Sequence, residues 1–322
     1  MKPIHYFLWL LILLSLLWLS ACSDSNLEQG SQKGTELGTQ LSTQLDNNKR
    51  KTITIELSNI DDLIALFKSH HYTQEYWDKG ERSVPRITFD AVSEQWKLSS
   101  QNLPVKLKKE IFFRVMAPLV LMSNENILAE REIVKKGALT QGSLLAIANK
   151  YYVINDESPL MTEKKRQLLL TKVDVMPPSL VLAQAAEESG WATSRFTSEG
   201  NAFFGQWDFS GKGMIPKQQR KALGNYGLAR FDSPLSSVEG YMFNINTTGA
   251  YQKLRDLRAK LRLDKKESTG LVLAGTLDKY SERGQAYIDS IRSMIRYNKL
   301  QHVDEAYLVD GPLLKLINKV AQ

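Results

Sequence analysis

The sequence has few of the residues that cross-link a fold or bind metal ions. Its 322 residues include one cysteine and four histidines. A single thiol excludes a disulfide within the chain, and the histidines are not spaced with acidic residues as zinc ligands are. No serine lies in the strand–turn–helix motif of a hydrolase nucleophile. We therefore expect chemistry without a metal ion or other cofactor.

Excess charge of one sign is also small, at +7 over the whole chain. The densest basic run spans residues 253–266, where Leu254, Leu257 and Leu261 recur at helical spacing. The charges then form the outer face of an amphipathic helix. Since no aromatic residues interleave with them, we expect a solvated face and no nucleic-acid partner.

The first residues are typical of an export signal. Lys2 and His5 precede an apolar run over residues 6–19, which is short for a transmembrane helix, and small residues follow it. This order predicts a signal peptide over residues 1–21.

The sequence Leu19-Ser-Ala-Cys22 resembles the lipobox of bacterial lipoproteins, whose cysteine is acylated and begins the mature chain. The resemblance implies that Cys22 is lipidated, and Ser23 after it implies the outer membrane. The partner is then outer-membrane lipid and the location is the periplasm. An uncleaved anchor, or an ordinary signal with a chance cysteine, remains an alternative.

The rest of the chain divides into four parts. Residues 22–50 are rich in Gln, Ser, Thr, Gly and Asn and lack aromatics, so we expect a flexible tether. Residues 51–150 are predicted to form a helical N-terminal region, residues 151–305 the catalytic domain, and residues 306–322 a C-terminal tail.

Hydrophobic periodicity predicts a mainly α fold with a small β or irregular lobe. Residues 51–57 alternate as a short strand does, Pro118 is expected to kink or break its helix, and residues 211–231 predict a loop or small hairpin. The expected helices are 59–70, 103–122, 124–136, 143–152, 162–172, 179–188, 236–247, 249–260, 268–277 and 285–296.

One helix carries the clearest chemical signal, Ala183-Gln-Ala-Ala-Glu-Glu-Ser-Gly-Trp191. Its alanines permit close helix packing, and Gly190 can end it in a left-handed conformation. A glutamate here faces the negative end of the helix dipole and is partly buried. Both effects favour the protonated form that a general acid needs. On the residues alone, a structural glutamate at a helix end is the favoured interpretation, because two adjacent glutamates are common on solvated faces.

This motif, with Asn201-Ala-Phe-Phe-Gly205 after it, resembles the signature of the bacterial glucosaminidase family, glycoside hydrolase family 73. The segment from Tyr280 to Leu300 is similar to its Bax-like branch, and the resemblance covers residues 103–300. It implies a lysozyme-like fold and cleavage of β-linked N-acetylglucosamine in peptidoglycan. It also implies that Glu188 is the catalytic acid and Glu187 is structural.

The sequence departs from the family pattern at two points. Ala192 replaces the usual glycine after the motif tryptophan, and the β lobe lacks the second carboxylate that the family often has. An inverting enzyme needs such a base, whereas assistance by the sugar's acetamide needs none. The candidates are Asp208, Asp232 and Glu282. We favour Glu282 as the second catalytic residue, with an ion pair to Arg283 as the alternative.

Five further residues are predicted to bind substrate. Tyr280 and Tyr287, seven positions apart on a predicted helix, are expected to line the cleft and orient the acetamide. Packing of these rings in the core is the alternative for both. Trp191 and Trp207 can each stack on sugar rings, although a core anchor is favoured for Trp191. The five are Tyr280, Tyr287, Trp207, Asn201 and Phe204.

Three functions fit the sequence. The first is a monomeric, lipid-anchored endo-β-N-acetylglucosaminidase that hydrolyses peptidoglycan. The second is a lytic transglycosylase, which also works with one catalytic glutamate. The third is a catalytically inactive lipoprotein that binds peptidoglycan, which the missing lobe carboxylate permits.

Overall fold

The computed structural model describes residues 50–217 and 226–319, without the side chains of Glu94 and Gln95. The predicted signal peptide, Cys22 and the tether up to residue 49 lie outside the described residues.

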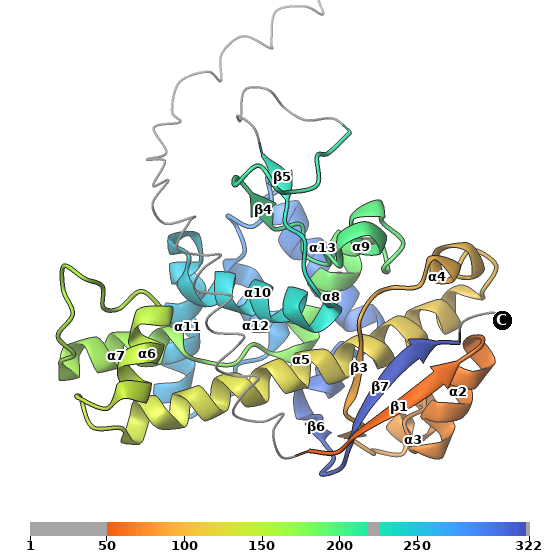
Figure 1. Ribbon diagram of the computed structural model, residues 1–322, viewed down its shortest axis with the longest axis horizontal. Helices are drawn as coiled ribbons and strands as arrows, with labels where there is room; N and C mark the ends of the chain where they lie inside the picture. Colours follow the sequence, from red (N-terminus) through yellow and green to blue (C-terminus); the bar gives the residue numbers. More distant parts are fainter. Residues whose placement is uncertain (1–49, 218–225, 320–322) are drawn as a thin grey trace, which may run out of the picture.

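The described helices and strands follow one another as Figure 1 shows. The α-helices are α2 (Ile60–Ser69), α3 (Gln74–Asp78), α4 (Glu94–Ser99), α5 (Val105–Lys136), α6 (Gly142–Lys150), α7 (Glu163–Lys172), α8 (Pro178–Ser189), α9 (Arg195–Gly200), α10 (Pro234–Thr247), α11 (Gln252–Leu263), α12 (Gly270–Leu273) and α13 (Gln285–Tyr297). Short 3₁₀ turns are η2 (Gly249–Tyr251), η3 (Ala274–Thr276) and η4 (Leu300–Glu305). The strands are β1 (Thr52–Leu57), β2 (Ser83–Val84), β3 (Ile87–Phe89), β4 (Trp207–Asp208), β5 (Gly227–Leu228), β6 (Tyr307–Leu308) and β7 (Leu313–Asn318).

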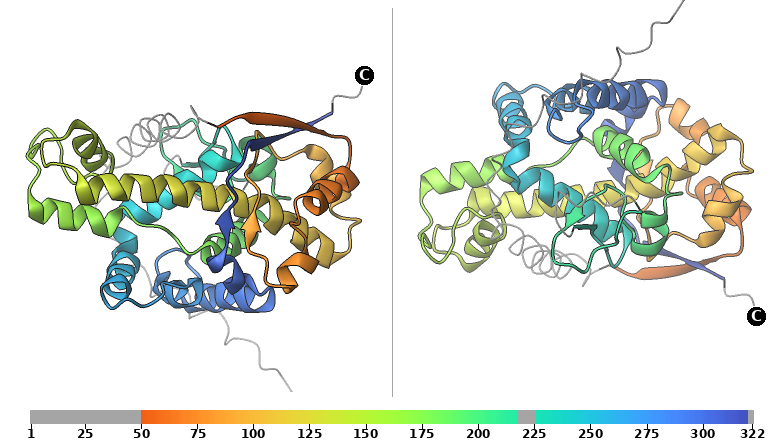
Figure 2. Two further views of the ribbon diagram at one scale, coloured as in Figure 1. Left: turned by 90° about the horizontal axis from the view of Figure 1, so that it is seen from below. Right: turned by 90° about the horizontal axis from the view of Figure 1, so that it is seen from above.

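The long helix α5 runs along the length of the molecule (Figure 1 and Figure 2). It passes through Pro118 without interruption, so the expected break near this residue is wrong. Pro118 is buried between Ala117 and Leu119, which are buried too, and this packing offsets the lost backbone hydrogen bond. By length and composition α5 could cross a membrane, yet 67% of its apolar window is buried, as in a core helix.

The motif helix α8 occupies the centre of the fold. It contacts α5, α12, α13 and η4. Ala183, Ala185 and Ala186 are fully buried, and their small side chains allow this close approach on several sides. The position of α8 therefore fixes the residues at its C-terminal end within the core.

A small parallel sheet joins the two ends of the described chain. Its order is β1–β7–β3, with Thr52 opposite Leu313 and Ile87 opposite Leu314. Figure 1 shows β7 between β1 and β3. Residues 306–322, which the sequence predicts as a tail, contain β6 and β7. The N-terminal region expected to be helical also contributes β1, β2 and β3.

A two-stranded lobe forms where the sequence predicts a loop or small hairpin. Strand β4 pairs antiparallel with β5, and Met214 bridges to Leu228. A Cβ atom on Gly227 would lie 2.7 Å from the backbone carbonyl carbon of Gly213, so only glycine allows this approach. The predicted fold class, mainly α and lysozyme-like with a small β lobe, is confirmed.

A buried charge cluster holds the segment before α8. Asp174 is 1% exposed and lies 3.6 Å from the Nη1 atom of Arg131. Arg262 contacts it through Nε at 2.8 Å and through Nη2. Arg258, also 1% exposed, donates to the carbonyl oxygens of Asp174 and Val175. These bonds connect α5 and α11 to the segment that leads into α8.

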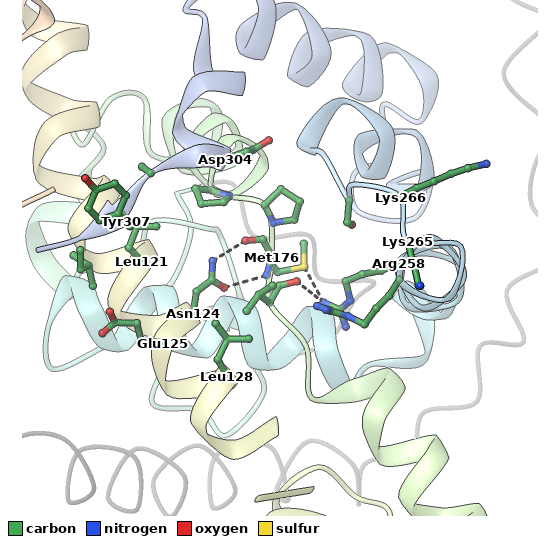
Figure 3. A pocket seen from close by; sticks show the side chains of 17 residues that line it. Leu121, Asn124, Glu125, Leu128, Met176, Arg258, Lys265, Lys266, Asp304 and Tyr307 are labelled. Atoms are coloured by element: carbon green, nitrogen blue, oxygen red, sulfur yellow. Dashed lines mark hydrogen bonds between the residues drawn. The ribbon is translucent and has the colours of Figure 1, made fainter. Parts of the chain in front are cut away.

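A pocket of about 550 Å³ lies beside this cluster. Figure 3 shows Asn124 and Arg258 on either side of Met176. Asn124 donates to the Met176 carbonyl at 2.8 Å and accepts from its N–H at 3.1 Å. The backbone just before α8 is therefore hydrogen-bonded to α5 as well.

A second buried cluster lies near an acid whose pKa is raised by burial. Glu130 accepts hydrogen bonds from Tyr151 at 2.8 Å and from Lys150 at 2.6 Å. Nearby, Asn126 donates to Glu239 at 3.3 Å. Burial raises the pKa of Glu239 to about 7. This effect outweighs the charge of Lys150 and the hydrogen bond from Asn126, which both lower the pKa.

This shift predicts a pH-dependent effect of Glu239→Gln on stability. The pKa of Glu239 is higher in the folded state than in the unfolded state. The stability that its protonated carboxyl group contributes is therefore complete below pH 4.5 and is lost as pH rises through about 7. The variant escapes this loss. The difference in free energy of unfolding between the variant and the wild type should shift by about 2 kcal/mol in favour of the variant between pH 5 and pH 8. Urea denaturation at the two pH values measures this, and an equal difference at both would contradict it.

Candidate active site

Glu188 lies in the last turn of α8, next to the residue that ends the helix. Gly190 caps the helix with a φ of +57°, a left-handed conformation that favours glycine. Glu187 points to a different partner, since it accepts from Arg283 at 2.7 Å and from Ser290 at 3.2 Å. The two adjacent glutamates therefore have different environments.

The Glu188 carboxyl group is partly buried and held by one tyrosine. The Tyr287 hydroxyl donates to its Oε1 atom at 2.7 Å. Burial raises the pKa of Glu188 above its ordinary value of 4.5, and the charge of Glu187 acts in the same direction. The Tyr287 hydrogen bond and the Arg283 charge oppose this shift. The geometry supplies a carboxylic acid that stays protonated to higher pH than a free glutamate.

Behind Tyr287 a chain of hydrogen bonds runs into the core. Gln184 donates from Nε2 to the Tyr287 hydroxyl at 3.1 Å, and Tyr241 donates to Gln184 Oε1 at 2.5 Å. All three side chains are at most 1% exposed. The sequence predicts no role for Gln184 or Tyr241. The position of Gln184 one turn before Glu188 was the available signal, whereas nothing in the sequence marked Tyr241.

Tyr280 and Tyr287 lie together, but only Tyr287 is in α13, because Tyr280 lies in the turn before this helix; the expectation of one helix for both is wrong. Their rings stack with centroids 5.3 Å apart, and the Tyr280 hydroxyl donates to the Phe204 carbonyl at 3.1 Å. Phe204 is buried and stacks on Tyr241 at 4.1 Å. The structure thus places Phe204 behind the site, where it supports the tyrosines.

Gly205 leaves space beside the second oxygen of the acid. It has a φ of +63°, and a Cβ atom built on it would lie 3.7 Å from Glu188 Oε2. The Asn-Ala-Phe-Phe-Gly motif therefore ends on a backbone that passes close to the carboxyl group. A side chain here would be strained and would occupy space next to Oε2.

Asn201 connects two parts of the fold. It is 8% exposed, ends α9 in a left-handed conformation, and its amide nitrogen donates to the carbonyl oxygens of Asp90 and Phe231 at 3.1 Å each. Both amide hydrogens are therefore used by the backbone. This geometry assigns Asn201 to positioning the motif and does not present its amide nitrogen to a sugar.

The β lobe carries an exposed aromatic cluster. Trp207 is 51% exposed and stacks on Tyr226 at 4.9 Å, and Phe209, which is 42% exposed, lies 5.7 Å from Trp207. Flat exposed rings of this kind suit stacking on sugars. Trp191 instead packs between Phe112 and Phe113 at 5.5 and 5.3 Å, as expected for a core anchor.

The three candidates for a second carboxylate lie in different surroundings. Glu282 is exposed in the turn before α13, and Asp232 is exposed before α10. Asp208 is 5% exposed in β4 and accepts from the Ser210 N–H at 2.7 Å. Arg283, the proposed alternative partner of Glu282, bonds Glu187. Among the described residues, the hydrogen bond to the Glu188 carboxylate comes from Tyr287.

The departure at Ala192 falls at a position where glycine is favoured. Ala192 has a φ of +61° and Trp191 a φ of +63°. Local hydrogen bonds hold this conformation, since Ser189 Oγ accepts from the Ala192 N–H at 2.9 Å and Trp96 donates to the Trp191 carbonyl at 3.1 Å.

Over the described residues, no group of three or more His, Cys, Asp or Glu side chains could hold a metal ion.

Comparisons with known proteins identify the family of this chain. Residues 165–300 match the family model Glucosaminidase, described as mannosyl-glycoprotein endo-beta-N-acetylglucosaminidase. "Protein bax" of Escherichia coli strain K12 is 32% identical over 199 residues, which cover 60% of this chain and 70% of that protein. No solved structure matches. The chain belongs to the Bax-like branch of the glucosaminidase family.

Proposed function

We propose that this protein hydrolyses the β-1,4 bonds of N-acetylglucosamine in the glycan of peptidoglycan, as an endo-acting enzyme with Glu188 as general acid. The observation that carries the proposal is the environment of Glu188. It lies at the end of the central helix, its pKa is raised by burial, and one of its oxygens is held by Tyr287. Family membership supports a glycosidase that acts on this class of glycan.

The chemistry follows from a single protonated acid. Glu188 gives its proton to the glycosidic oxygen as the bond to the sugar's anomeric carbon breaks. The acetamide oxygen of the same sugar attacks that carbon, and water then opens the intermediate. This route needs no second carboxylate, which agrees with the exposed position of Glu282. The hydroxyl hydrogens of Tyr287 and Tyr280 are used by Glu188 and by the Phe204 carbonyl, so these tyrosines support the acid and do not present a hydrogen to the acetamide.

A lytic transglycosylase is the second candidate, and the same observation supports it. That reaction also uses one glutamate, but a hydroxyl of the muramyl sugar takes the place of water and leaves an anhydro end. A protein that binds peptidoglycan without cleaving it is the third candidate.

We also propose where the protein acts. The apolar run before Cys22 and the lipobox-like sequence support an acylated Cys22 in outer-membrane lipid, with the monomeric folded part in the periplasm. Peptidoglycan is then the glycan within reach of the tether.

Product analysis separates the three candidates. Purified sacculi are incubated with the protein, and the released fragments are analysed by mass spectrometry. We expect fragments with reducing N-acetylglucosamine ends. Anhydro-muramyl ends would instead establish the transglycosylase. Binding to sacculi with no soluble fragment would reject both enzymes in favour of the binding protein.

A further inference from the structure

We propose that Gln184 and Tyr241 are positioning residues for Glu188: their hydrogen bonds make the Tyr287 hydroxyl donate to Oε1, so that the acid carries its transferable proton on Oε2. The inference rests on the proposed function, because it concerns the acid that function requires. It concerns how the proton is placed, which neither the motif nor the family comparison addresses.

The first step is the orientation of the Gln184 amide. Tyr241 is fully buried, and burial raises its pKa well above the ordinary value of 10, so its hydroxyl keeps its proton. Among the described residues, the acceptor for that proton is Gln184 Oε1 at 2.5 Å. A reversed amide would leave the Tyr241 hydrogen buried without an acceptor, which is costly. Tyr241 therefore fixes the amide oxygen on its own side.

The second step is the direction of the Tyr287 hydrogen bond. With the amide oriented by Tyr241, Gln184 presents its Nε2 hydrogen to the Tyr287 oxygen at 3.1 Å. A hydroxyl has one hydrogen, and that of Tyr287 then points to Glu188 Oε1 at 2.7 Å. Oε1 is an acceptor in this arrangement. A proton on the neutral acid must therefore sit on Oε2.

The third step is the space around Oε2. Gly205 has no side chain, and a Cβ atom there would be 3.7 Å from Oε2. The backbone thus leaves an approach to the oxygen that carries the proton. If the amide of Gln184 were reversed, Tyr287 would donate to Gln184, and its oxygen would accept the acid's proton from Oε1. The acid would then be protonated but unable to deliver its proton on the open side.

Tyr241→Phe tests this arrangement with two measurements that a purely structural residue would not move together. Without the Tyr241 hydroxyl the amide can reverse, and the Glu188 carboxylate loses the Tyr287 hydrogen. We expect the pKa of Glu188 to rise by about one pH unit, because a lost hydrogen bond to a charged acceptor has this magnitude. We also expect kcat on soluble peptidoglycan glycan chains to fall about tenfold, with KM changed less than about twofold.

The pKa is read from ¹³C NMR titration of carboxyl-labelled protein, with the Glu188 signal assigned by its absence in Glu188→Gln. Tyr151→Phe is the matched control, since it removes a buried tyrosine hydroxyl that donates to the buried Glu130. It should leave the Glu188 titration and kcat unchanged. Gln184→Met removes the amide with little change in volume. Within the described part of the chain, nothing then donates to the Tyr287 oxygen in place of Gln184, so this oxygen can accept the proton of the neutral acid, and the Glu188 pKa is expected to rise as well. If circular dichroism shows that Tyr241→Phe is not folded, the Glu188 titration in Gln184→Met tests the proposal instead.

The results separate this inference from the proposed function. A Glu188 titration that is the same in wild type, Tyr241→Phe and Gln184→Met overturns the inference, even if activity falls. If the wild type releases no fragments but the titration shifts as expected, the positioning stands and the proposed function fails.

Discussion

Replacing Glu188 with glutamine should lower the rate of glycan cleavage by about a thousandfold, within the range that a general acid contributes. Glutamine has nearly the same shape, and its amide oxygen can still accept from Tyr287, so the fold should be preserved. The loss would then come from the missing proton. The measurement is the release of soluble fragments from sacculi, with circular dichroism to confirm folding.

Glu187→Gln is the matched control for this change. Glu187 bonds Arg283 and Ser290 and is adjacent to Glu188 in sequence, yet its carboxylate takes no part in the proposed proton transfer. We expect its activity to stay within a few-fold of the wild type. Unchanged cleavage by Glu188→Gln, or an equal loss in both variants, would reject Glu188 as the acid.

The same pair of residues gives the expected pH dependence. Activity requires protonated Glu188, so the rate should fall as pH rises through its pKa, which burial has raised above 4.5. The charge of Glu187 contributes to the rise. Its removal should move the descending limb of the kcat/KM profile to lower pH.

The second large effect is expected at Asp174, which is buried among three arginines. Asp174→Asn removes the negative charge that compensates Arg131, Arg258 and Arg262. Two of these guanidinium groups are almost fully buried and cannot regain solvent. We expect the free energy of unfolding to fall by about 3 kcal/mol, the cost of leaving buried charge unpaired. Thermal or urea denaturation at pH 7 measures it.

Asp278→Asn is the control for this stability prediction. Asp278 forms an ion pair with Lys253 at 3.1 Å, and both side chains are substantially exposed. Loss of an exposed pair should change stability by less than about 1 kcal/mol. Equal effects of the two substitutions would show that the Asp174 cluster is not energetically special.

The sequence predicted the parts of this protein that depend on local pattern. The α8 helix with its Gly190 end, the α2 helix expected over residues 59–70, and the small β lobe all follow from residue order and turn chemistry. The distinction between Glu188 and Glu187 came from the family motif. In the structure Glu187 has an ion-pair partner, and burial raises the pKa of Glu188.

The remaining features depend on contacts between distant residues. Proline at position 118 predicts a break in the helix, but α5 continues through it because Pro118 is buried in tertiary packing. Strand β7 is as long as β1, but only its partners β1 and β3 make it the centre of a sheet. Tyr241 carries no motif and meets Gln184 only because α10 and α8 both pack against α5, which local periodicity does not reveal.

The central position of β7 has a consequence for how fast the protein folds. Arg50 beside β1 bonds Asp310 near β7, and the two residues are 260 positions apart in the chain. Strands this distant must search for each other against a large loop-closure entropy, and such high contact order slows folding. The helical core around α5 and α8 can form from more local contacts. We therefore expect a refolding intermediate in which that core is protected from hydrogen exchange before β1, β3 and β7 are.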